Sequence, residues 1–144
     1  MGEQEQRDIA RKILVTLYTS WAHHGHSSLN ALIAEEKWEK RLFDEVIDKL
    51  EEEHGLIKHV ANPNVFDLTP EGVLYVEDNG IVSEDEANKH RQIRAHVLSY
   101  LADFYDKEGS RAHALWQDIA KGAPVEHEMK ILVDLSLLND LGYT

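Results

Sequence analysis

The sequence of 144 residues contains no cysteine, only three prolines and eight glycines, and no long apolar run. Without cysteine the chain can form no disulfide, thiolate metal site or cysteine nucleophile, which is typical of a cytoplasmic protein. No segment approaches the roughly 18 apolar residues of a membrane span, and the first residues lack the pattern of a secretory signal. We therefore expect a cytoplasmic protein with no membrane partner.

Basic residues are also scarce. Fifteen lysines and arginines stand against 27 aspartates and glutamates, a formal net charge of −12 with histidine neutral. This charge disfavours indiscriminate binding to nucleic acid over the whole surface. The sequence has no phosphate-binding glycine loop, Gly-x-Ser-x-Gly elbow or His-Glu-x-x-His pair, so we predict no enzyme and no cofactor. Hydrophobic residues make up 42% of the chain, which is enough for a folded core.

Hydrophobic periodicity and turn residues predict a mainly helical first half with one hairpin. Thr69-Pro70 is typical of a helix start, with the hydroxyl as N-cap and proline in the first turn. The predicted elements, in chain order, are a helix from Arg7 to before Gly25, a short helix capped by Ser27 or Ser28, a helix ending at Gly55, strands at 56–60 and 65–68, and a helix from Thr69-Pro70 to Asn79-Gly80.

The second half begins with a capping box, Ser83-Glu84-Asp85-Glu86, which predicts a long helix to about Lys107. The part from Glu84 to Gln92 has almost no apolar residues and is predicted to be a solvated connector. The rest repeats the start of the chain at a constant offset: Arg7 aligns with Arg91, Ile9 with Ile93 and Leu17 with Leu101. This indicates either two copies of one unit or a coincidence of helical periodicity.

The order of helix, short helix, helix and hairpin in residues 7–79 resembles a winged helix-turn-helix domain. The run Leu68-Thr69-Pro70-Glu71-Gly72 is similar to the end of the wing in MarR-like and PadR-like regulators. Gly122-Ala123-Pro124 lies where a second copy would have its helix-turn-helix turn. The resemblance implies a mainly α fold with minor β: a winged helix-turn-helix domain at 1–80, followed by a wingless helical unit at 81–144.

In this family the third helix enters the major groove and the tip of the hairpin contacts the DNA backbone. The resemblance therefore implies a DNA-associating transcriptional regulator that binds double-stranded DNA as a homodimer. The positions of this sequence that match the contacting residues are Lys40 and Arg41 on the third helix, and Lys58, His59, Asn62 and Asn64 on the wing.

The same helix departs from the family pattern because carboxylates follow its two basic residues. They would face the phosphates of the DNA, although a carboxylate can accept a hydrogen bond from cytosine. The sequence therefore leaves open a second interpretation, a winged-helix protein-interaction or assembly module that binds no nucleic acid. In that case the charges form pairs one turn apart on a solvated face. The carboxylates are Asp44, Glu45, Asp48, Glu51 and Glu52, and the predicted pairs are Lys40–Asp44, Arg41–Glu45 and Glu45–Lys49.

Three other groups of residues have a plain structural interpretation. The basic stretch 89–94 is predicted to offset Glu84, Asp85 and Glu86 rather than to bind phosphate or an acidic partner. The cluster His23-His24-Gly25-His26 has no cysteine and no placed carboxylate beside it, so no metal site is predicted. Three tryptophans are predicted to be core residues rather than stacking platforms for bases, namely Trp21, Trp38 and Trp116.

The end of the sequence is rich in leucine and stops where the hairpin of a second copy would begin. A wingless copy cannot cover all of these leucines, so we predict an exposed apolar patch that serves as a self-association surface in a homodimer. The residues predicted to form it are Leu135, Leu137, Leu138 and Leu141.

Overall fold

The computed structural model describes residues 2–23, 26–108, 134 and 136–141. The chain divides into two compact units, Met1–Val82 and Ser83–Thr144. The described residues are mostly helical and include a small three-stranded antiparallel sheet, which confirms the mainly helical class with minor β.

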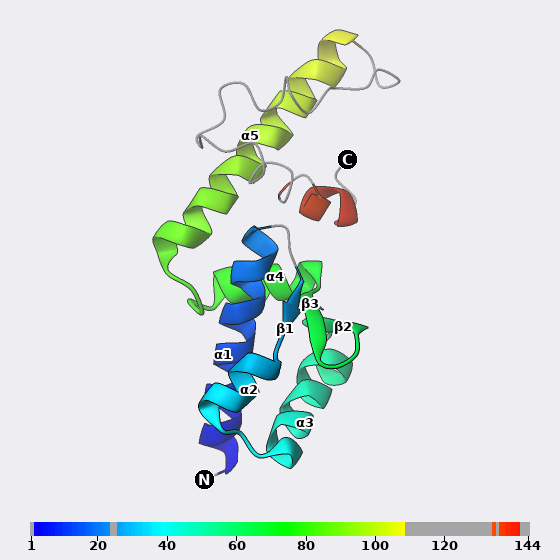
Figure 1. Ribbon diagram of the computed structural model, residues 1–144. Helices are drawn as coiled ribbons and strands as arrows, with labels where there is room; N and C mark the ends of the chain where they lie inside the picture. The colour runs from blue at the N-terminus through cyan, green and yellow to red at the C-terminus, as the bar shows by residue number, and fades with distance from the viewer. Residues whose placement is uncertain (1, 24–25, 109–133, 135, 142–144) are drawn as a thin grey trace. The chain divides into compact units, whose positions relative to one another are not determined.

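Unit 1 contains four α-helices, a π-helical segment and three strands among its described residues (Figure 1). α1 packs against α3, α4 and β3. The elements are α1 (Gly2–Ala22), β1 (Ser27–Ser28), α2 (Asn30–Glu36), α3 (Lys40–Asp48), the π-helical segment η1 (Lys49–Glu53), β2 (Ile57–Ala61), β3 (Val65–Leu68) and α4 (Pro70–Asp78).

The core of unit 1 includes apolar side chains at helical spacing on α1 and α3, the pattern that predicted these helices. On α1, Ile9, Ile13, Leu14 and Leu17 are all buried, and Tyr18 beside them is fully buried. The prediction placed the start of this helix at Arg7, but α1 begins at Gly2. Glu3 and Glu5 lie in its first turn, where negative charge stabilises a helix. On α3, the buried residues are Phe43, Val46 and Ile47.

The sheet has the strand order β1-β3-β2, with both pairs antiparallel. The predicted hairpin of β2 and β3 is confirmed. Strand β1 was not predicted: Ser27 pairs with Phe66 of β3. The predicted serine cap is corrected by one residue: the N-cap position is Leu29, whose side chain caps nothing, while the Ser28 hydroxyl accepts a hydrogen bond from the backbone N–H of Asn30 at 3.4 Å.

The start of α4 confirms the role predicted for Thr69 and Pro70. The hydroxyl of Thr69 accepts a hydrogen bond from the backbone N–H of Gly72 at 3.0 Å and donates one to the carbonyl of Gly55 at 2.6 Å. Pro70 occupies the first turn. Thr69 therefore ties the start of α4 to the loop before β2.

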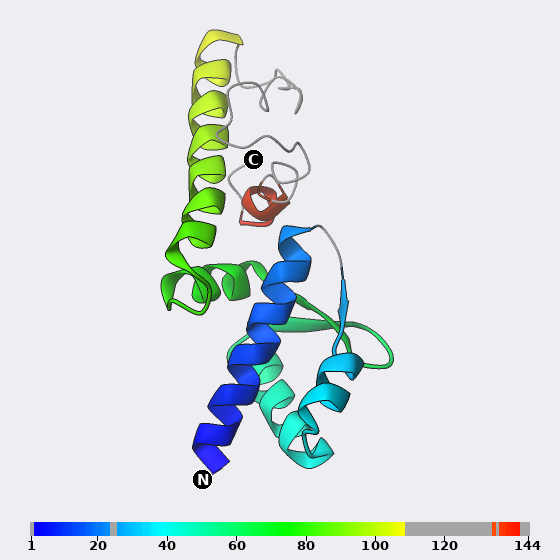
Figure 2. The ribbon, with the colours of Figure 1, turned by 60° about the vertical axis from the view of Figure 1, so that its left-hand side comes forward.

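Unit 2 contains the long helix α5 (Glu84–Glu108), and residues 134 and 136–140 are also helical (Figure 2). The predicted cap is confirmed, since the backbone N–H of Glu86 donates to the Ser83 hydroxyl at 3.3 Å. Most of residues 84–92 are exposed, as predicted for a solvated connector, but Ala87 and His90 are buried, so one side of this segment packs against other residues. The part of the predicted second copy at 109–133, including Gly122-Ala123-Pro124, lies outside the described residues.

Candidate functional site

The two predicted DNA-contacting residues of α3 lie at its first turn and extend into solvent. The side chains of Lys40 and Arg41 are 91% and 90% exposed. Each is close to a carboxylate one turn later: Lys40 Nζ lies 3.8 Å from Asp44 Oδ2, and Arg41 Nε lies 3.4 Å from Glu45 Oε1. Two of the three predicted pairs are therefore present, and both cations are partly neutralised by their own helix.

The third predicted pair, Glu45 with Lys49, is replaced by a bridge through α1. Lys49 Nζ donates to Gln6 Oε1 at 2.7 Å, and Gln6 Nε2 donates to Glu45 Oε2 at 3.0 Å. The side-chain amide offers a donor and an acceptor at once, so it satisfies both charged groups. Sequence reasoning missed Gln6 because it began the first helix at Arg7.

The exposed surface of α3 and η1 is acidic. From Lys40 to Glu53 these elements carry six carboxylates and three basic side chains, a formal charge of −3. Glu51 is bound to the hairpin, since its Oε2 accepts a hydrogen bond from the backbone N–H of His59 at 2.9 Å. We call the remaining carboxylates the acidic face; they are Asp44, Glu45, Asp48, Glu52 and Glu53.

The turn of the hairpin is attached to the start of α2. The backbone N–H of Leu29 donates to the carbonyl of Asn64 at 2.9 Å, and the Asn64 amide donates to Asn30 Oδ1 at 2.9 Å. The Asn30 side-chain amide in turn donates to the carbonyl of Pro63 at 3.4 Å. The peptide bond between Asn62 and Pro63, which precedes this carbonyl, is cis. Asn64, predicted as a DNA contact, therefore holds the turn in place, whereas Asn62 is exposed.

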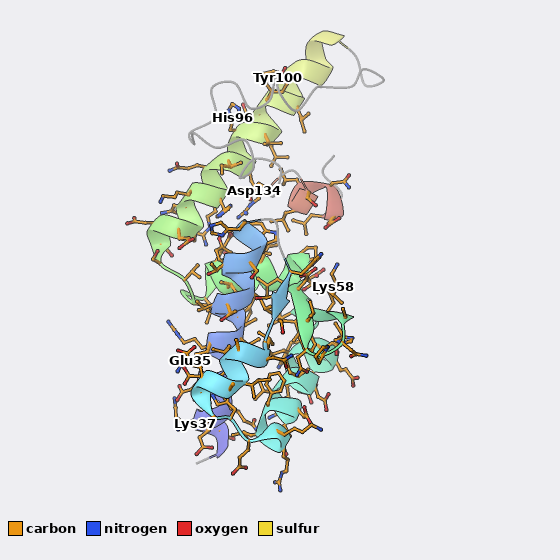
Figure 3. The ribbon with its side chains drawn as sticks, in the orientation of Figure 1. Glu35, Lys37, Lys58, His96, Tyr100 and Asp134 are labelled. Atoms are coloured by element: carbon orange, nitrogen blue, oxygen red, sulfur yellow. The ribbon has the colours of Figure 1, made fainter. Side chains whose placement is uncertain are left out.

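The two other predicted hairpin contacts, Lys58 and His59, are exposed on β2. Figure 3 shows Lys58 on the hairpin, away from α1. The ring of His59 packs edge-on against Phe66 with centroids 5.2 Å apart, and Val60 after it is 43% exposed. The hairpin therefore offers one lysine and an apolar side chain rather than a cluster of cations.

Two histidines of the cluster at the end of α1 have hydrogen-bond partners, and one partner is a carboxylate of β3 that the sequence did not place beside the cluster. Among the residues that the structure describes, no group of three or more histidines, aspartates and glutamates could hold a metal ion. His26 Nδ1 lies 2.8 Å from both oxygens of Asp67, and His23 Nδ1 lies 2.8 Å from the carbonyl of Thr19. His24 lies outside the described residues, so the prediction that the whole cluster binds no metal stays a prediction.

Two of the three tryptophans contact aromatic residues and are half-buried. Trp21 lies against Tyr18 with ring centroids 5.1 Å apart, and Trp38 stacks on Phe43 at 6.2 Å. Both rings therefore pack against aromatic side chains, but neither is fully buried, so the prediction of core residues is confirmed only in part. Trp116 lies outside the described residues.

Two residues of the basic stretch of α5, His90 and Arg94, form a buried charge cluster with Asp134 that the sequence analysis did not predict. Asp134 is fully buried and accepts hydrogen bonds from Arg94 Nη1 at 2.8 Å and from His90 Nδ1 at 2.7 Å. Arg91 behaves as predicted, with Nη1 3.4 Å from Glu84 Oε2. The prediction for His90 and Arg94 is wrong: both are buried and bind a carboxylate 44 and 40 residues away rather than one turn away.

The predicted self-association surface is also corrected. Leu137 is 3% exposed and Leu138 is 2% exposed, so both are buried within the chain and cannot form an open apolar patch. Leu141 is half-buried, and Leu135 lies outside the described residues.

No protein-family model, no characterised protein and no experimentally determined structure matches the chain. Within the described residues, none of the helices combines the length and apolar character that a membrane crossing requires. The features that bear on function are therefore the geometry and charge of α3, η1 and the hairpin.

Proposed function

We propose that residues 1–80 form a winged helix-turn-helix domain that acts as a protein-interaction module and binds a Lys/Arg-rich segment of another protein through the acidic face. The architecture supports the first part. α1, α2, α3 and the β2–β3 hairpin follow one another in the order that the resemblance implies. The sheet also contains β1, which pairs with β3 on the side opposite β2.

The observation that carries the choice of ligand is the charge of the helix that would read DNA. Duplex DNA presents one negative charge per roughly 1.7 Å of its axis. A helix with a formal charge of −3 placed in the major groove would bring Asp44, Asp48 and Glu52 towards phosphates. A Lys/Arg-rich segment has the opposite charge, and charge complementarity of this kind selects partners and speeds their association.

A second candidate function, DNA association as a transcriptional regulator, is favoured by one specific observation. Lys40 and Arg41 are highly exposed at the first turn of α3, which is the end of a recognition helix that contacts base edges. Lys58 on the hairpin would then contact the backbone. Binding would require both α3 cations to leave Asp44 and Glu45, and the freed carboxylates would stay close to the DNA.

Titration of the full chain with a fluorescently labelled Lys/Arg-rich peptide and, separately, with a labelled DNA duplex separates the two functions. At low salt we expect the peptide to bind and the duplex to show no binding below millimolar concentration. The double variant Lys40→Ala/Arg41→Ala should bind the peptide about twofold to fivefold more tightly, because it removes two positive charges beside the acidic face. Fluorescence anisotropy measures both affinities.

The same variant, Lys40→Ala/Arg41→Ala, also tests the second function, DNA association. If the duplex binds, and the variant weakens that binding and flattens its salt dependence, then Lys40 and Arg41 contact phosphates and the interaction-module function is rejected. Lys89→Ala/Arg91→Ala on α5 removes the same charge in unit 2 and is the matched control, expected to leave duplex binding unchanged.

A further inference from the structure

Unit 1 contains a pocket of about 500 Å³ that opens to solvent between α1, the α3–η1 segment and α4. Its floor is apolar and consists of buried side chains: Leu14 from α1, Val46 and Leu50 from α3 and η1, and Leu56 from the loop before β2. The volume falls within the range of roughly 300–1,000 Å³ that small-molecule sites occupy. Neither proposed function uses this pocket.

The rim of the pocket is positively charged in a chain of formal charge −12. Arg7 and Lys49 lie on it with one carboxylate, Glu3, and with the side chain of His54. Arg7 is exposed, and no hydrogen bond or ion pair joins it to the described residues. The hydrogen bond from Lys49 to the neutral amide of Gln6 leaves the ammonium without a directly bonded carboxylate. Both cations are thus available to a negatively charged ligand.

We propose that this pocket binds a small organic carboxylate with an apolar body. The carboxylate lies between Arg7 and Lys49, where charge-assisted hydrogen bonds hold it, and the apolar body covers Leu14, Leu50 and Leu56. Tyr75, which is 41% exposed and also lines the pocket, supplies an aromatic side wall with a hydroxyl. The rim charge selects an anion, and the closed apolar floor selects a compact molecule.

The test uses the full chain and 2-naphthoate, a fluorescent carboxylate with a rigid apolar body, with 2-naphthol as the uncharged analogue. We expect saturable binding of one naphthoate per chain below millimolar concentration, and naphthol binding at least about fivefold weaker because it lacks the carboxylate. Lys49→Gln and Arg7→Gln should each weaken naphthoate binding about threefold to tenfold. Lys89→Gln, an exposed lysine of α5, is the control and should change nothing.

Backbone amide chemical shifts locate the ligand. On addition of naphthoate, the shifts of Ala10, Leu50, Leu56 and Tyr75 should move together, and Ala10→Phe, which places a ring in the pocket, should weaken naphthoate and naphthol alike. Any of four results would overturn the proposal. The two probes could bind with equal affinity, or Lys49→Gln could bind naphthoate as Lys89→Gln does. The chemical-shift changes could be confined to other residues, or binding could fail to saturate below millimolar concentration.

Discussion

Replacing Asp134 with alanine is expected to lower the free energy of unfolding by about 3–5 kcal/mol. The carboxylate of Asp134 is fully buried and pairs with Arg94, whose side chain is 10% exposed, and with His90, whose side chain is 4% exposed. Removing Asp134 takes away the carboxylate that the buried guanidinium binds at 2.8 Å. Losing a buried charge partner costs far more than losing an exposed ion pair. Denaturant unfolding of the full chain measures the effect.

Two further variants distinguish loss of the charge pair from general damage to this segment. Asp140→Ala changes an exposed carboxylate nearby and should alter stability by no more than about 0.5 kcal/mol. Asp134→Asn keeps one oxygen acceptor and loses the charge, so its effect should lie between those of the two alanine variants. If Asp134→Ala were as mild as Asp140→Ala, the buried cluster would not stabilise unit 2.

Gly72→Ala is expected to destabilise unit 1 by about 3 kcal/mol, the upper end of the usual cost of overpacking. Gly72 lies in the first turn of α4, and a Cβ added there would overlap the backbone carbonyl of Leu56. That carbonyl accepts a hydrogen bond from the backbone N–H of Thr69 at 3.0 Å, so it cannot rotate away without breaking the junction between hairpin and helix. Thermal unfolding followed by circular dichroism reports the loss.

Gly80→Ala is the matched control. Gly80 has a φ of +65°, but a Cβ there meets nothing within 4 Å, so only the backbone conformation opposes the substitution. We expect a cost of about 1 kcal/mol. A Gly72→Ala variant no less stable than Gly80→Ala would mean that α4 can move away from Leu56 and that the close approach is not required.

Local patterns in the sequence predicted the elements whose burial or capping is encoded within a few residues. The apolar stripe of α1, the buried face of α3 and the start of α4 at Thr69-Pro70 follow from spacing and side-chain chemistry. The residue types in the run from Leu68 to Gly72 each have a structural reason: Thr69 caps α4, Pro70 occupies its first turn, and Gly72 leaves room for the backbone of Leu56.

The missed features depend on partners far away in the chain. Strand β1 consists of two serines without an apolar pattern, and it is defined by its pairing with β3. His90 and Arg94 are indistinguishable in sequence from solvated helix residues until Asp134 is placed beside them. The Gln6 bridge between Glu45 and Lys49 likewise joins residues about 40 positions apart. Periodicity within one helix contains no information about such contacts.

The candidate site was predicted in part. Lys40 and Arg41 were placed correctly on an exposed helix face with their paired carboxylates, since spacing of four residues fixes neighbours on a helix. Asn64 could not be assigned from sequence, because its role depends on Asn30 of α2. The pocket beside α1 was not predicted at all, since it is formed by segments from three separate parts of unit 1.

The interaction-module function is tested most directly by comparing two variants that lose the same charge at different places. Asp44→Asn/Asp48→Asn removes two negative charges from the acidic face, and Asp85→Asn/Glu86→Gln removes two from the exposed first turn of α5. The Lys/Arg-rich peptide is titrated into each variant at about 0.15 M salt, where charges beyond roughly 8 Å are largely screened. We expect the α3 variant to bind about threefold to tenfold more weakly and the α5 variant to match the unmodified chain. Equal losses in both variants, or no loss in the α3 variant, would contradict a specific binding role for the acidic face.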